Sequence, residues 1–223
     1  SIFIKSLNFV EIEFERLKSI PVPLKTCLGG LFVGIIALSF PHVLGNGFDV
    51  TSDLISLDSD ESGNIVVGKN LTNNENSDSI IDELLIFIIS IMALKIIATS
   101  VSIGSGGSGG IFTPSLFIGA AIGAGMGLFM NDLGIITHPG AFALVGMAAF
   151  VASTTRATLT AIVLLFEMTA TYEIILPLML SCVVADATCY VISKESAYTS
   201  KLARMGINIC LLYTSDAADE AEC

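Results

Sequence analysis

Long runs of apolar residues, separated by short polar segments, make up most of this chain. The runs cover residues 24–43, 80–101, 111–130, 140–155, 157–169 and 174–192. A helix that crosses the hydrocarbon core of a bilayer needs about 20 such residues, and several of these runs fall short of that. Because short apolar segments interrupted by glycine or proline are typical of broken transporter helices, we expect an all-α, polytopic membrane protein with partly spanning helices.

The N-terminal end is predicted to leave the membrane and return to it. Residues 3–20 mix apolar and charged side chains, as expected for a helix that emerges at a membrane surface, and Pro21 and Pro23 then break it. Residues 45–57 are predicted to form a short re-entrant helix. Residues 58–79 are polar and acidic, which predicts a loop.

Basic residues in the short connections predict the orientation of the chain. Lys and Arg are enriched in cytoplasmic loops. With the spans above, the positions around Lys25, Arg156 and Lys194 all fall on one side, which we expect to be the inside. The acidic loop 58–79 then lies outside.

The composition is typical of a membrane protein, and the acidic residues that give the chain its net charge lie in two segments. The chain has 223 residues, of which 53% are hydrophobic and 14% charged, whereas a soluble domain is usually about 25% charged. The net charge of −11 is concentrated in residues 49–83 and in the last eight residues. The acidity therefore belongs to one loop and one tail, and it predicts no nucleic-acid partner.

The C-terminal residues differ in character from the rest. CLLYTSDAADE, residues 210–220, looks like a translated sequencing adaptor and interrupts the membrane-like pattern. We therefore expect residues 209–223 to be a non-native tail, and the natural protein to continue past residue 208 with other residues. The five cysteines show no metal-ligand or redox spacing, and no disulfide framework is expected.

The stretch GSGGSGGIFTP, residues 104–114, allows two interpretations. Gly/Ser runs form flexible linkers in water, but no charged residue lies between Lys95 and Asn131 to suggest a watery setting. At membrane depth, irregular backbone is tolerated only where protein or a water-filled cavity satisfies it. Pro114 suits the first turn of a helix. We therefore expect residues 104–110 to lead into a helix that starts inside the membrane.

Such a helix start favours an anion, because its first N–H groups are unpaired and carry about half a positive charge. A nucleotide-binding P-loop would need Gly-Lys-Ser/Thr after the glycines, and GGIFT lacks it. One helix terminus contributes only about 0.3–2 kcal/mol, so a stable anion site needs further donors. The sequence contains neither a Ser/His/Asp set nor metal-ligand spacing, so we do not expect an enzyme, and we expect no cofactor.

These residues resemble the ClC family of chloride channels and proton-coupled chloride exchangers. GGIFTP, residues 109–114, is similar to the family's Gly-x-Phe-x-Pro anion-pathway motif. GMAAFVASTTRATLTAIVLLFEMT, residues 146–169, and SAYTSKLAR, residues 196–204, are similar to the segments that follow that motif. The resemblance implies that residues 1–208 are the second half of an inverted-repeat membrane domain, which transports chloride as a channel or as a proton-coupled antiporter.

The resemblance also implies which residues contact the ion. Backbone N–H groups of Ile111 and Phe112, after Gly109 and Gly110, would face the central chloride, and the hydroxyl of Tyr198 would contact it from the inner side. Residues 157–192 match helices of the family's homodimer interface. The gating and proton-pathway glutamates of the family are expected upstream of Ser1, so the sequence does not distinguish a channel from an exchanger.

Two alternatives stay open beside the transport interpretation. The chain could be a non-transporting membrane scaffold or a transporter relic, and an intact upstream gating-glutamate motif would decide in favour of transport. Lys95, Arg156 and Glu167 lie in or beside spans, where an ionisable side chain is a functional candidate by default. For these three we expect structural pairing or snorkelling.

Overall fold

The computed structural model describes residues 2–16, 21–59, 65–66, 77–133, 138–169, 172, 174–192 and 196–200. Its helices are α1 (Ile2–Arg16), α2 (Val22–Ser39), the 3-10 turn η1 (Pro41–Val43), α3 (Phe48–Ile55), α4 (Ser77–Gly104), α5 (Phe112–Asp132), α6 (Pro139–Thr155), α7 (Thr158–Thr169) and α8 (Ile175–Ile192). The all-α expectation is confirmed, with one addition. Two residue pairs form a short antiparallel ladder between β1 (Asp58–Ser59) and β2 (Ile65–Val66).

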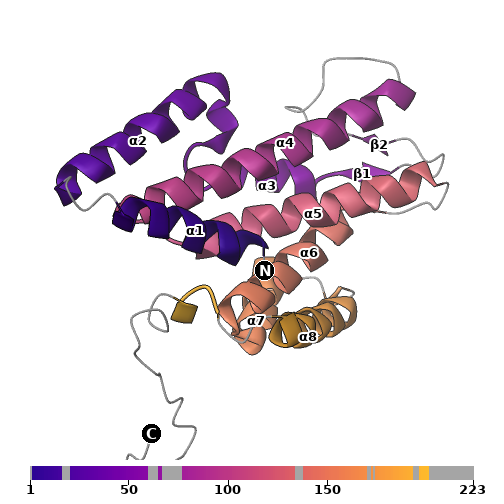
Figure 1. Cartoon of the computed structure of the whole chain (residues 1–223). Helices are drawn as coiled ribbons and strands as arrows, with labels where there is room; N and C mark the ends of the chain where they lie inside the picture. The colour runs from indigo at the N-terminus through magenta and orange to yellow at the C-terminus, as the bar shows by residue number, and fades with distance from the viewer. Residues whose placement is uncertain are drawn as a thin grey trace, which may run out of the picture.

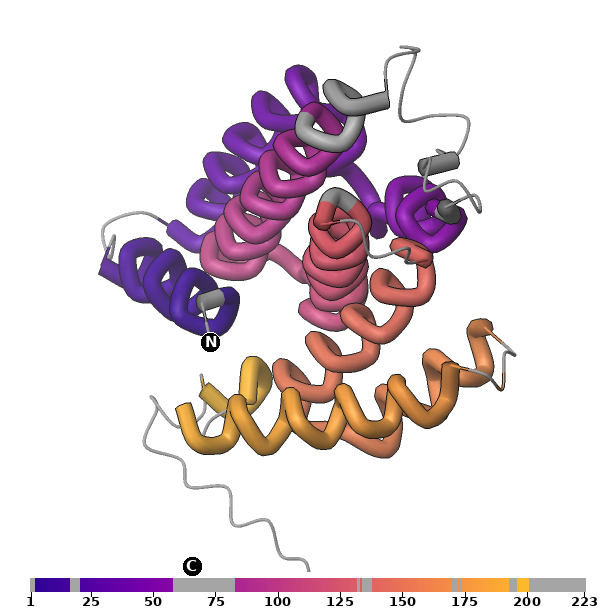
Figure 2. The backbone as a smooth tube through the Cα atoms, turned by 90° about the vertical axis from the view of Figure 1, so that its right-hand side faces the viewer, coloured from indigo at the N-terminus to yellow at the C-terminus, as the bar shows by residue number. Residues whose placement is uncertain are grey.

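Helices α4 and α5 run side by side through the middle of the molecule (Figure 1). Helix α1 packs against α4, and α6 leads from α5 to α7 and α8, which lie together on one side (Figures 1 and 2). The main core lies between α4, α5 and α6, and Phe117, Leu128 and Met147 are almost completely buried there.

Among the described residues, four helices are long and apolar enough to cross a membrane: Val22–Ser39, Glu83–Gly104, Phe112–Asn131 and Ile175–Ile192. Helices α6 and α7 are apolar but shorter, as the sequence predicted. The predicted span 24–43 is wrong at its end. Helix α2 stops at Ser39, since Pro41 has no N–H with which to continue the helical ladder.

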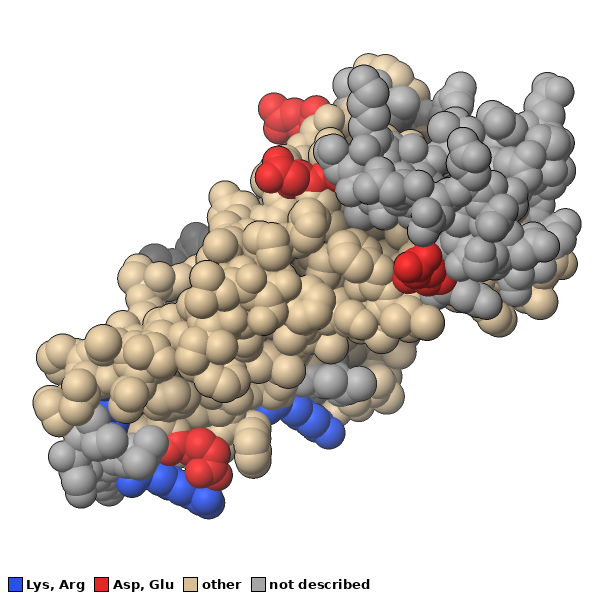
Figure 3. Space-filling model, turned by 90° about the horizontal axis from the view of Figure 1, so that it is seen from above, with Lys and Arg blue, Asp and Glu red and all other residues tan. Residues whose placement is uncertain are grey.

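On one face of the molecule, the visible charged side chains lie towards its two ends. In Figure 3, the Lys and Arg side chains gather at one end of the visible face and most Asp and Glu side chains at the other, with a wide uncharged band between them. A polar group in the hydrocarbon region costs free energy, so charges at both ends of an apolar band suit a protein that spans a bilayer.

Helices α5 and α6 cross with their backbones almost in contact. A Cβ atom on Gly119 would lie 2.6 Å from the carbonyl oxygen of Gly146, and a Cβ on Gly123 would overlap the carbonyl oxygen of Phe142. Small residues four apart let membrane helices approach this closely. The crossing fixes α5, whose N-terminus carries the candidate site, against α6.

Candidate anion-binding site

The glycine-rich stretch between α4 and α5 is folded backbone. The N–H of Gly107 donates to Ser102 O (3.1 Å), and the N–H of Gly106 donates to Ile103 O (3.1 Å). Gly106 has a φ of 89°, a conformation that glycine adopts without a steric cost. These bonds form a Schellman motif, which pairs the last carbonyl groups of α4. The linker interpretation is therefore wrong for residues 104–107.

Helix α5 begins without a side-chain cap. Its first internal bond runs from the N–H of Ser115 to Ile111 O (3.1 Å). Pro114 has no N–H, and no hydrogen bond among the described residues starts at the N–H of Ile111, Phe112 or Thr113. Three backbone donors at the positive end of the helix dipole are thus available to a ligand.

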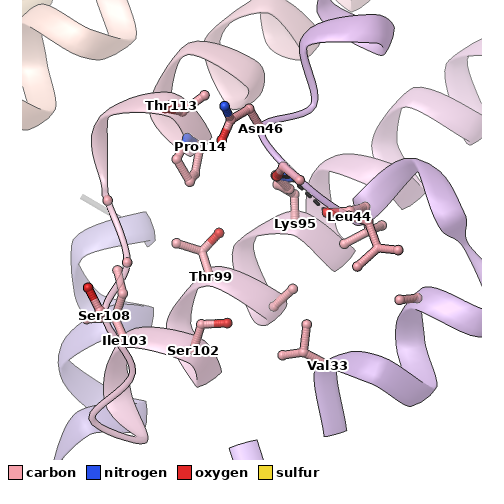
Figure 4. A pocket seen from close by; sticks show the side chains of 16 residues that line it. Val33, Leu44, Asn46, Lys95, Thr99, Ser102, Ile103, Ser108, Thr113 and Pro114 are labelled. Atoms are coloured by element: carbon pink, nitrogen blue, oxygen red, sulfur yellow. Dashed lines mark hydrogen bonds between the residues drawn. The ribbon is translucent and has the colours of Figure 1, made fainter. Parts of the chain in front are cut away.

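A cavity of about 270 Å³ lies beside this helix start (Figure 4). Gly109, Gly110 and Thr113 border it on one side. Helix α4 contributes Lys95 and Thr99 on another side, and no Asp or Glu among the described residues borders it. The lining is therefore rich in donors and lacks a described negative charge.

Lys95 is buried in the middle of a membrane span. Its side chain is 3% exposed. The Nζ atom donates to Val43 O (2.8 Å) and Gly45 O (2.9 Å), and it lies 5.4 Å from the centre of the Phe117 ring. Lys95 thus holds the turn between η1 and α3 against α4. The Lys95 side chain points into the protein. Of the two roles expected for it, structural pairing therefore fits and snorkelling to the membrane surface does not.

The predicted site residues divide into two groups. Gly109 and Gly110 border the cavity, and Ile111 and Phe112 follow directly, with their side chains packed on the core. Tyr198 does not border the cavity. It is 49% exposed, in a segment where the N–H of Ala197 donates to Thr154 O (3.0 Å). The chloride contacts proposed for these residues stay predictions.

Sequence reasoning missed the partners of the glycine motif in this cavity. Lys95 was visible as a lone cation in an apolar run, and Thr99 lies one helical turn after it. Asn46, which also borders the cavity, comes from a turn about 50 residues earlier. The sequence feature that pointed to these partners was Lys95 itself, because an ionisable residue inside a membrane span is a functional candidate.

Arg156 and Asp186 form a second charged group away from this cavity. Arg156 ends α6 in a left-handed conformation with φ 62°. Its Nη1 lies 3.5 Å from Asp186 Oδ1, and its guanidinium lies 5.4 Å from the centre of the Tyr190 ring. Thr158 Oγ1 donates to Asp186 Oδ2 (3.0 Å). The pairing expected for Arg156 is present, and it joins α6 and α7 to α8.

Comparisons with known proteins agree with the fold. The family described as voltage gated chloride channel matches residues 1–190. A ClcB-like protein of Ralstonia nicotianae is 35% identical over 187 residues, which are 83% of this chain and 38% of that protein. The voltage-gated ClC-type chloride channel ClcB of Escherichia coli is 32% identical over 202 residues, which are 89% of this chain and 42% of ClcB.

A solved structure has the same fold. The crystal structure of a slow cyanobacterial Cl⁻/H⁺ antiporter superposes with a TM-score of 0.66 at 31% identity, covering 92% of this chain and 43% of the antiporter. The chain thus spans about 40% of the length of the relatives that it matches.

Proposed function

Because this chain belongs to the voltage-gated chloride channel family, we propose that it is the C-terminal half of a longer membrane protein that transports chloride. The family consists of channels and transporters, and this chain is a multi-pass integral membrane protein in which the part that the structure describes has four apolar spans. We call the proposed longer protein the complete protein. It works as a channel or as a proton-coupled antiporter, and the chloride moves without covalent chemistry.

The uncapped start of α5 is the observation that carries this proposal. The N–H groups of Ile111 and Phe112 have no acceptor in the described chain, and they follow a folded glycine turn at the end of a membrane span. Groups of this kind are normally satisfied, and an unpaired N–H in a membrane costs several kcal/mol. A chloride ion at this point accepts from both N–H groups and interacts favourably with the helix dipole.

Further donors come from outside this turn. Tyr198 contributes its hydroxyl from the inner side, and the first half of the complete protein contributes the remaining contacts. One helix terminus stabilises an anion by only about 0.3–2 kcal/mol, far less than the cost of burying an unpaired ion. The site is therefore complete only when both halves are present.

The outer surface of α7 and α8 supports a homodimer through residues 157–192. Leu159 and Val163 on α7 and Leu176, Leu180 and Val183 on α8 are all exposed and apolar. Such side chains suit lipid or a second apolar helix face equally well. The family membership favours a second copy of the complete protein as the partner of this surface. In the proposed orientation, residues 58–79 lie on the outer side of the membrane.

Chloride efflux from liposomes tests this function. The complete protein is expected to release chloride selectively, and residues 1–208 alone are expected to release none, because the ion needs donors from both halves. Both are reconstituted at equal protein-to-lipid ratio, and efflux is followed with a chloride electrode. Selective efflux from residues 1–208 alone would contradict the half-site argument, and no efflux from the complete protein would favour the scaffold or relic alternative.

A further inference from the structure

Residues 196–200, which include Tyr198, form a single capped turn. The N–H of Ser196 donates to Thr199 Oγ1 (2.9 Å), and the N–H of Thr199 donates to Ser196 Oγ (3.1 Å). The N–H of Ser200 donates to Ser196 O (3.1 Å), as in the first turn of a helix. This reciprocal pattern is that of a capping box, with threonine in place of the usual Glu or Gln. The backbone of Tyr198 is therefore fixed between bonded residues.

Two further hydrogen bonds hold this turn against other helices. The N–H of Ala197 donates to Thr154 O (3.0 Å) at the end of α6, and Ser200 Oγ donates to Asn8 Oδ1 (3.0 Å) on α1. Figure 2 shows the turn beside α1. Ala197 and Ser200 are buried, whereas Tyr198 between them is half exposed. The two bonds together set the place from which the Tyr198 side chain leaves the backbone.

The bond to Asn8 depends on a side chain, and the bond to Thr154 does not. On α6 the acceptor is a backbone carbonyl group, which any residue at position 154 would supply. On α1 the acceptor is the side-chain amide oxygen of Asn8, which lies 192 residues before Ser200 in the sequence. An apolar side chain at position 8 would therefore leave the buried Ser200 hydroxyl without this acceptor.

Helix α1 also packs against the end of α4 that leads to the glycine motif. The hydroxyl oxygens of Ser6 and Ser100 are 3.2 Å apart and share a hydrogen bond. A Cβ atom on Gly104, the last residue of α4, would lie 3.2 Å from the backbone nitrogen of Glu11, so the two helices are close there. The glycine turn and then Ile111 follow Gly104. Helix α1 thus connects the Tyr198 turn to the segment before the start of α5.

We propose that Asn8 is a positioning residue for chloride binding. By accepting from Ser200, it holds the Tyr198 turn where one ion contacts both the Tyr198 hydroxyl and the N–H of Ile111. The inference rests on the proposed function, which gives Tyr198 its chloride contact. Because Asn8 acts through Tyr198, its loss weakens chloride binding no more than loss of the Tyr198 hydroxyl does.

Variants of the complete protein test this role by calorimetry with chloride. Asn8→Leu keeps a similar volume and removes the acceptor, and Ser200→Ala removes the donor. Each should weaken chloride binding about 2- to 10-fold, the equivalent of one neutral hydrogen bond. The double variant should bind as weakly as either single variant and no more weakly, because both changes break the same bond.

Two further comparisons separate positioning from general loosening of α1. Ser6→Ala is the matched control, since it breaks the other hydroxyl contact of α1 and leaves the Tyr198 turn alone; chloride affinity should stay unchanged. In a Tyr198→Phe background, Asn8→Leu should cause no further loss. Fluorotyrosine placed at position 198 alone should give a fluorine NMR signal that shifts or broadens in Asn8→Leu and not in Ser6→Ala.

The outcomes distinguish this inference from the proposed function. Weaker binding in Tyr198→Phe with parent-like binding in Asn8→Leu overturns the positioning role and leaves the proposed function standing. The same loss from Ser6→Ala, or a full further loss from Asn8→Leu in Tyr198→Phe, also overturns it. If Asn8→Leu does not fold, Ser200→Ala decides, because it removes a single oxygen atom. Absence of chloride binding and of chloride efflux in the parent overturns the proposed function itself.

Discussion

Replacing Gly123 with alanine is expected to destabilise the complete protein by about 1–3 kcal/mol, the usual cost of forcing an extra carbon atom into a packed interior. The added Cβ would overlap the carbonyl oxygen of Phe142 and would lie 2.9 Å from the Cα of Ala143. Both are backbone atoms of α6 and cannot move as a side chain can. Helices α5 and α6 would have to separate, and the start of α5 would lose its support.

Gly125, on the same helix, is the matched control. A Cβ there would meet only Leu85 Cδ2, at 3.8 Å, which is an ordinary contact. Gly125→Ala should therefore be neutral or stabilise by up to about 1 kcal/mol, because alanine favours helix over glycine. Unfolding in mixed micelles measures both variants. Equal stabilities for Gly123→Ala and Gly125→Ala would contradict the close crossing.

Asp186→Leu is expected to destabilise the complete protein by about 1–3 kcal/mol, the cost of leaving a partly buried hydrogen-bonding group without its partner. The variant removes the carboxylate that lies 3.5 Å from Arg156 Nη1 and that accepts from Thr158. The side chains of Arg156 and Asp186 are only 18% and 31% exposed. The partly buried arginine charge would then remain without this partner.

A double-mutant cycle tests whether the pair acts as a unit. Arg156→Met with Asp186→Leu removes both charges and keeps similar volumes, so it should cost less than the two single variants together. The same micelle unfolding measurement applies. Strictly additive losses would show that Arg156 and Asp186 are not coupled and that the link from α6 and α7 to α8 depends on other contacts.

The helices could be predicted because apolar run length is a local property. Residues 80–101 and 111–130 were predicted to span. The observed α4 extends three residues further at each end, and α5 starts one residue later and ends two residues further. The type of turn that ends α4 could also be predicted, since Gly106 and Gly107 permit the left-handed turn that closes the helix. These features depend on neighbours within six residues.

The cavity could not be predicted because its walls come from distant segments. Asn46 and Lys95 meet there with Gly109 and Gly110, and no local pattern relates residue 46 to residue 109. The β1–β2 pair in the acidic segment was also missed, since a two-residue ladder leaves no alternating pattern to detect. The residues 60–64 and 67–76 of the predicted outer loop, and the tail 209–223, lie outside the described residues.

Chloride binding by Ile111→Pro, compared with Ile111→Val, tests the anion site at α5 most directly. Ile111 has a φ of −86°, close to the value that proline requires, and its N–H makes no described hydrogen bond. Proline therefore removes one proposed donor without breaking the helical ladder, and valine keeps it. Calorimetry on the complete protein should show chloride binding about 10- to 100-fold weaker in Ile111→Pro, since a hydrogen bond to a charged group is lost, and nearly unchanged in Ile111→Val. Equal chloride affinity in the two folded variants would contradict the account.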